Sequence, residues 1–286
     1  YCHYGWLEKA AAQTQDDRTM RVVFLQADAD PNSPVTLELP EGECLGVRAY
    51  PLTDGVADDQ QSVDLSDSVG DRVLRWTPAG GSWRVAVSVA VPETIFQLSD
   101  RATDTFLDML YGEVERRLGR DAMGHSFVGI FQDEHPSTPR DVYTEHLAEL
   151  FQQRCGYDIA RAIPALHFDV GSLTPKYRTD YFDIYLMEDE RCYWRRVFDW
   201  VESRGLLTSH DNWGRQNLVQ QSFGYIDYFR TQRWFTAPGN DDFGQAPVTQ
   251  RNYYDTKIAA SIARLYQRPR VWSEAFHSSG WGRTTE

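Results

Sequence analysis

The chain has 286 residues, 41% of them hydrophobic and 25% charged, and carries a formal net charge of -13. This composition is typical of a globular protein and argues against wholesale disorder. A surface with this much negative charge repels nucleic acid and anionic lipid, and we expect neither as a partner. A membrane-spanning helix needs about 20 apolar residues in a row, and no apolar run in the sequence is that long. The four cysteines do not show the spacing of a zinc site.

The N-terminal segment, residues 1–92, is predicted to be rich in β-strands. Short apolar or alternating runs indicate strands at residues 21–26, 35–39, 72–76 and 83–91. Residues 54–71 are acidic and polar and are predicted to be a loop.

Helical periodicity begins near residue 99. An apolar stripe over residues 107–118 predicts a first helix, and residues 127–131 form a short apolar strand. Thr138 is expected to cap a second helix that ends at Gly156. The remaining predicted elements are a long helix at 177–204, strands at 206–208 and 225–229, a helix at 254–265 and a strand at 270–273.

Strands that alternate with helices favour an α/β fold with a parallel sheet. We expect a (β/α)8-type barrel that is incomplete in this chain, because its candidate strands lie near residues 21, 83, 127, 206, 226 and 270, whereas a closed barrel needs about eight. Residues 1–92 would supply the early strands with an inserted loop, and residues 93–286 the central and C-terminal part.

Acidic residues follow three of these strands. Glu134 comes after the strand at 127–131, Asp211 after the strand at 206–208, and Glu274 directly after the strand at 270–273. Active sites of α/β barrels lie at the carboxyl ends of the strands, and two carboxylates that flank a sugar linkage can hydrolyse it. We therefore predict that Glu134 and Glu274 are the catalytic pair; the alternative is that each forms a structural salt bridge with an arginine.

Further polar and aromatic residues cluster at the same positions, and nine Trp and fifteen Tyr give flat rings that could stack on sugars. The predicted substrate-binding residues are Asp133, His210, Asp211, Trp213, Asp241 and Trp281. The aspartates suit calcium and the histidines suit zinc, but no HExxH or EF-hand pattern is present, so the metal ligands stay open.

Several segments resemble the α-L-rhamnosidases of glycoside hydrolase family 106. They are residues 63–83, Gly129–Glu134, Gly205–His210, Ala237–Asp241 and, at the C-terminal end, residues 257–263, 273–276 and 280–281. The resemblance implies a barrel, inverting cleavage of terminal rhamnose from plant or microbial polysaccharides, and possible Ca²⁺ near the sugar, with Glu134 and Glu274 at the strand-end glutamates of the pattern.

We therefore expect a carbohydrate substrate and a secreted or periplasmic location, any signal peptide being already absent from a chain that begins with Tyr1. One alternative function is a non-catalytic glycan-binding barrel or an inactive fragment of such an enzyme. Another is a metal-dependent hydrolase that uses Asp133, His135 and His210.

Overall fold

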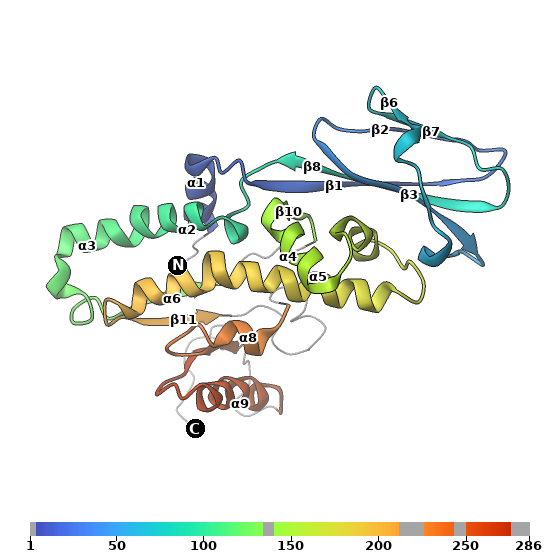
Figure 1. Ribbon diagram of the computed structural model, residues 1–286. Coiled ribbons are helices and arrows are strands. Elements are labelled where there is room, and N and C mark those ends of the chain that lie inside the picture. The colour runs from blue at the N-terminus through green and yellow to red at the C-terminus, as the bar shows by residue number, and fades with distance from the viewer. Residues whose placement is uncertain (1–3, 134–139, 212–225, 243–249, 276–286) are drawn as a thin grey trace, which may run out of the picture. The chain divides into compact units, whose positions relative to one another are not determined.

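The computed structural model describes residues 4–133, 140–211, 226–242 and 250–275 (Figure 1). The chain divides into two compact units, which are considered separately below. The antiparallel unit comprises Gln15–Ile95 and Thr138–Glu188, and the parallel unit comprises Tyr1–Thr14, Phe96–Ser137 and Asp189–Glu286. The domain boundary predicted near residue 92 stays a prediction.

The antiparallel unit is built on a six-stranded sheet in which every pair of neighbours is antiparallel. Its strand order is β10 (Val142–Thr144), β1 (Thr19–Ala29), β8 (Ser82–Pro92), β3 (Glu43–Thr53) and β4 (Val56–Ala57), with β5 (Val63–Asp64) also paired to β3. A second sheet contains β2 (Val35–Glu38), β7 (Val73–Trp76) and β6 (Val69–Gly70). Figure 1 shows β1, β8 and β3 as the long strands of this unit.

Residue alternation explains how this unit forms its core. Val85, Val87 and Val89 of β8 are at most 1% exposed and share a hydrophobic cluster with Val47 of β3 and Leu74 of β7. Alternate residues of a strand point to one face, so a run of β-branched side chains at this spacing buries one face of the sheet.

Two longer helices belong to this unit. Helix α4 (Glu145–Cys155) begins at Thr144, whose hydroxyl accepts a hydrogen bond from the Leu147 amide at 2.9 Å, and ends at Gly156 with a left-handed φ of 82°. Helix α5 (Thr174–Asp189) follows after the 3-10 turns η6 (Ile159–Arg161) and η7 (Ile163–Leu166). Thr144 therefore provides the cap that the sequence assigned to Thr138, which lies outside the described residues.

The described part of the parallel unit contains four short strands, with helical segments before and between them in the chain. The strands are β9 (Gly129–Asp133), β11 (Leu207–Asp211), β12 (Gly239–Asp242) and β13 (Trp272–Ala275); β9 pairs parallel with β11, and β12 with β13. The helical segments are α1 (Tyr4–Thr14), η3 (Phe96–Leu98), α2 (Asp100–Leu107), η4 (Asp108–Gly112), α3 (Glu113–Leu118), η5 (Arg120–Ala122), η8 (Glu190–Trp194), α6 (Arg195–Glu202), α8 (Tyr228–Gln232) and α9 (Gln250–Leu265).

Two of these segments, η4 and η8, are π-helices set within longer α-helical runs. A core cluster joins η8 and α6 to the strands: Tyr193, Trp194 and Val197 pack with Ile130 of β9 and with Phe235. The apolar stripe of this helix thus covers one face of the parallel strands.

The predicted (β/α)8-type barrel is wrong. Two strands counted toward it, β1 and β8, pair antiparallel with each other over Met20–Ala29. The strand expected at 225–229 is not observed, because helix α8 begins at Tyr228, and strand β12 was not among the predicted elements. An apolar strand pattern reports burial of a face but not the direction of the neighbouring strand, so the pattern of β1 and β8 could not reveal their pairing.

Other elements agree in position with the sequence analysis. The strands expected at 21–26, 35–39, 72–76 and 83–91 correspond to β1, β2, β7 and β8. The acidic segment 54–71, expected to be a loop, also carries the short strands β4, β5 and β6. Within the described ranges, no helix combines the length and the apolar character required to cross a membrane.

Candidate functional site

The carboxyl ends of the four parallel strands bring several predicted site residues into register. Asp133 at the end of β9 is the Cα partner of Asp211 at the end of β11. Asp241 of β12 is likewise the Cα partner of Glu274 of β13. The chain therefore contains two acidic register pairs at strand ends, as a site at the carboxyl edge of a parallel sheet requires.

The two strand pairs are neighbours. Ser209 of β11 forms a parallel bridge with Ala237, just before β12, and the Ala237 amide donates a hydrogen bond to the Thr208 carbonyl at 3.0 Å. The backbones approach so closely that a Cβ on Gly239 would lie 2.3 Å from the carbonyl oxygen of His210. Only glycine fits this position, because any side chain would separate β12 from β11.

The sheet curves around one face. The rings of Phe131 in β9 and Trp272 in β13 have centroids 5.1 Å apart, although β11 and β12 lie between their strands. Flat neighbouring strands lie about 4.8 Å apart, so the first and fourth of such a set would be roughly 14 Å apart. Strand alternation assigns positions 133 and 211 to the face of Phe131, and positions 241 and 274 to the face of Trp272.

Of the predicted site residues, the structure describes some fully and others in part. Asp133 is half-buried at the end of β9, and His210 is completely buried in β11. The strand positions of Asp211, Asp241 and Glu274 are described, but their side chains are not. Glu134, His135, Trp213 and Trp281 lie outside the described residues, so their roles stay predictions.

Aromatic rings surround His210 on the helix-facing side of the strands. Its ring centroid lies 5.5 Å from that of Trp194 and 5.2 Å from that of Phe235. Trp194 and Phe235 also meet edge to face at 5.6 Å. These contacts restrict the imidazole to a narrow range of orientations, since a close-packed interior leaves few rotamers open.

Sequence reasoning missed a set of buried polar atoms beside the strand ends. The hydroxyls of Ser209 and Ser273 and both polar side-chain atoms of Asn240 are buried without a hydrogen-bond partner in the described part of the chain. Buried polar groups in folded proteins are nearly always paired with protein or water. Of these three residues, Ser209 shares the face of Phe131, whereas Asn240 and Ser273 are Cα partners on the opposite face. The strand-end position of Asn240 next to Asp241 could have identified it from the sequence.

Asp189 is a second group that the sequence did not reveal. Its carboxyl is buried, and its Oδ2 accepts a hydrogen bond from the Trp194 indole at 2.6 Å. Burial raises the pKa of Asp189 to about 8, against the opposing effect of that hydrogen bond. A partial signal was present: position 189 lies three residues after Leu186 and four before Tyr193 on the apolar stripe of the predicted helix, although it also stands in a run of three acidic residues.

The neighbouring carboxylate, Glu190, is neutralised by ion pairs. Arg230 donates to its Oε2 at 2.7 Å, and Arg233 lies 3.2 Å from its Oε1. The Trp234 indole adds a third contact at 3.0 Å. Glu190 is thus a paired structural carboxylate, in contrast to Asp189, whose other oxygen, Oδ1, has no partner among the described residues.

Metal binding stays a prediction. Among the residues that the structure describes, no group of three or more His, Cys, Asp or Glu side chains could hold a metal ion. Two of the three aspartates that suit calcium, Asp211 and Asp241, have side chains outside that description.

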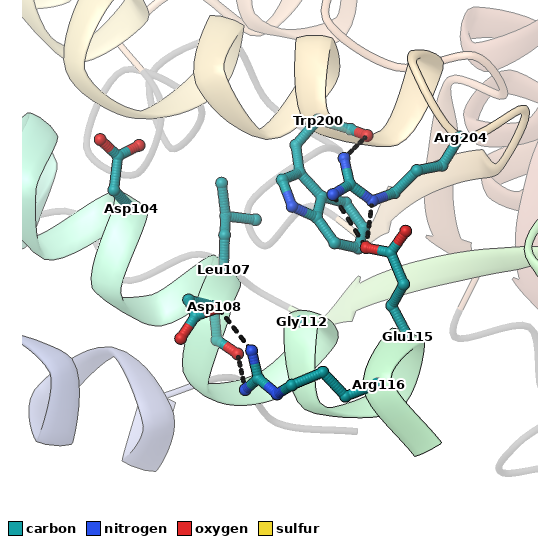
Figure 2. Close-up of a pocket in the computed structure, with 8 residues that line it drawn as sticks. All are labelled: Asp104, Leu107, Asp108, Gly112, Glu115, Arg116, Trp200 and Arg204. Carbon is teal, nitrogen blue, oxygen red and sulfur yellow. Dashed lines mark hydrogen bonds and ion pairs between the residues drawn. The ribbon is translucent and has the colours of Figure 1, made fainter. Parts of the chain in front are cut away.

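A cavity of about 360 Å³ lies between the α2–η4–α3 helical run and α6 (Figure 2). Its lining residues are Asp104, Leu107, Asp108, Gly112, Glu115, Arg116, Trp200 and Arg204. Arg204 pairs with Glu115 at 2.9 Å and stacks on Trp200 at 3.8 Å, and Arg116 pairs with Asp108 at 2.7 Å. Asp104 pairs with Arg196 outside the lining, so each charged lining residue has an ion-pair partner. No predicted site residue lines the cavity, and the strand ends remain the candidate site.

Comparison with known proteins gives a similarity in fold and no match in sequence family. No family model and no curated protein matches the chain. A solved structure, a rhamnosidase from Novosphingobium sp. PP1Y, is similar with a TM-score of 0.53 and 21% sequence identity over 78% of this chain. The match covers 23% of the rhamnosidase chain, so this chain resembles part of that protein in fold.

Proposed function

We propose that the chain contributes a glycoside hydrolase site that cleaves terminal α-L-rhamnosides by an inverting mechanism. The observation that carries the proposal is the pairing of acidic residues at the ends of parallel strands, Asp133 with Asp211 and Asp241 with Glu274. The similarity in fold to part of a rhamnosidase supports the same substrate class.

The chemistry requires two carboxyl groups with different tasks. We assign them to Glu134, which directly follows Asp133, and to Glu274, in either order. One would protonate the leaving oxygen, while the other would remove a proton from the attacking water on the opposite face of the sugar. Asp133, Asp211 and Asp241 would hold sugar hydroxyls, and Trp213 and Trp281 would stack on the ring. His210, which the sequence predicted to bind substrate, is completely buried on the helix-facing side and would instead orient the end of β11.

Curvature of the sheet supports a recess suited to a sugar. Phe131 and Trp272 meet on the face assigned to the acidic positions, and Trp272 is 43% exposed. A partly exposed aromatic ring beside hydrogen-bonding groups is the usual composition of a pocket that fixes a small ligand. A Ca²⁺ ion near the sugar and a secreted or periplasmic location are part of the same proposal.

The direct test is release of L-rhamnose from an aryl α-L-rhamnoside. We expect Glu274→Gln and Glu134→Gln each to lower kcat by at least about 100-fold, because general acid or base catalysis contributes roughly 10²–10⁴-fold. Glu202→Gln is the matched control, since Glu202 is an exposed glutamate of α6. All variants should keep the thermal unfolding midpoint of the parent protein.

Other outcomes separate the alternatives. Full activity in Glu274→Gln would remove this residue from the catalytic pair. L-rhamnose binding by the parent protein without any hydrolysis would favour the non-catalytic glycan-binding function, which agrees with the limited share of the rhamnosidase that this chain matches. Loss of activity on chelation, restored by zinc, would favour the metal-dependent alternative.

A further inference from the structure

The π-helix η8 connects a buried carboxyl group to the strand ends. An α-helix brings residues three and four apart together, whereas a π-helix turn joins residues five apart. Asp189 and Trp194 are five residues apart, and the indole donates to the carboxyl at 2.6 Å. The π turn is therefore what allows this side-chain hydrogen bond.

Two consecutive residues of η8, Tyr193 and Trp194, pack on the two neighbouring strands β9 and β11. The Trp194 ring packs on His210 of β11, and Tyr193 lies in the same buried cluster as Ile130 of β9. His210 and Gln132 are themselves Cα partners in the parallel ladder. Each comes directly before one of the acidic strand-end residues, His210 before Asp211 and Gln132 before Asp133.

Every side chain in this chain of contacts is buried. Asp189 is 5% exposed, Trp194 2% and His210 0%. A buried carboxyl is costly, so a stable fold rarely keeps one on a helix face that could carry leucine instead. π-Helical turns of this kind are also frequent at functional sites. Asp189 and Trp194 are therefore placed to hold the side chains near the strand ends in a fixed orientation.

We propose that Asp189 is a positioning residue for the strand-end site and acts on His210 through the indole of Trp194. The inference rests on the proposed function, because it assigns Asp189 a task at that site. The carboxyl oxygen fixes the indole plane, and the indole ring in turn fixes the imidazole that lies against it. Tyr193 packs with Ile130 and gives β9 a corresponding support.

Three variants separate positioning from general packing. Asp189→Asn keeps an oxygen that can accept the indole N–H, Asp189→Ala removes it, and Trp194→Phe removes the donor but keeps an aromatic ring. Asp121→Asn is the matched control, because Asp121 is an exposed aspartate of the same unit. The first readout is the ring carbon–proton NMR signal of His210, assigned by its loss in His210→Gln, together with the Trp194 indole signal.

We expect Asp189→Ala and Trp194→Phe to shift the His210 signal and to lower kcat/KM for an aryl α-L-rhamnoside by about 10- to 100-fold, as small misplacements at a site do. Asp189→Asn should restore both properties to near the parent values. If Asp189→Ala does not fold, Trp194→Phe and Asp189→Asn still give opposite expected results.

Two results would overturn the inference: an unchanged His210 signal in the variants that lose the hydrogen bond, or an Asp189→Asn protein as impaired as Trp194→Phe. The NMR readout needs no activity. A shifted His210 signal in a protein that does not cleave rhamnosides would therefore count against the proposed function and leave the contact between the three residues standing.

Discussion

At the scale of single residues, Asp189 ties stability to pH. Its pKa is about 8 in the folded protein against an ordinary 3.8, because burial disfavours the charged form. Between these values the folded protein keeps a proton that the unfolded chain has released. The stability that the neutral carboxyl contributes is therefore fully present below about pH 4. As the pH rises from about 4 toward about 8, the free energy of unfolding falls by about 1.4 kcal/mol per pH unit.

Asp189→Asn removes this titration. We expect the variant and the parent protein to be similarly stable near about pH 4, and the variant to be more stable by a margin that grows up to about pH 8. Urea unfolding across that range measures the difference, with Asp121→Asn as the control whose curve should follow that of the parent. If the free energies of unfolding of Asp189→Asn and the parent protein changed in parallel with pH, the Asp189 carboxyl would be ionised in the folded protein.

Gly239 is the residue on which the approach of β12 to β11 depends. An added methyl group would lie 2.3 Å from the His210 carbonyl oxygen and 2.8 Å from the Ser209 hydroxyl. We expect Gly239→Ala to destabilise the protein by about 1–3 kcal/mol, the usual cost of overpacking. Gly5→Ala is the control, because that position in α1 has nothing within 4 Å of the added Cβ. Equal stability of the two variants would contradict the close strand approach.

The sequence could locate the strand-end residues but not the groups behind them. Asp133 and His210 follow short apolar runs, so their place at strand ends could be predicted from pattern. Asp189 belongs to a run of three acidic residues on a helix, which is typical of a solvated surface. Its burial depends on the π turn at η8, a backbone feature that no residue type specifies.

At the scale of elements, the start of α4 shows how one side chain fixes a boundary. The Thr144 hydroxyl accepts the Leu147 amide, while Thr144 itself is the last residue of β10. We expect Thr144→Ala to lower the free energy of unfolding by about 1 kcal/mol. Thr144→Ser should lower it by much less, because serine keeps the capping hydroxyl. Chemical denaturation measures both. A serine variant as unstable as the alanine variant would show that the methyl group, not the cap, stabilises this boundary.

Element type was predictable where periodicity was long and unbroken. The long helix expected at 177–204 is observed as α5, η8 and α6, and the strand expected at 83–91 as β8. Short segments failed: the aromatic run at 225–229 suggested a strand, but Asp227 caps α8 by accepting the Arg230 amide at 2.9 Å. A local capping interaction outweighed strand propensity there.

At the scale of the whole molecule, the direction of neighbouring strands could not be predicted from the sequence. The barrel prediction treated β1 and β8 as parallel strands because helices follow later in the chain, whereas the two pair antiparallel across a long ladder. Strand β10, only Val142–Thr144, extends that antiparallel sheet from a distant part of the sequence. Such long-range pairing depends on contacts that local pattern does not record.

The central claim is that Glu134 and Glu274 face one sugar-binding site at the ends of the parallel strands. A crystal structure of the protein with L-rhamnose bound would measure the distance between their carboxyl groups. The account predicts a separation of about 6.5–9.5 Å, with the sugar between them, as inverting hydrolysis requires. Carboxyls on opposite faces of the sheet, or a sugar bound away from both, would contradict it.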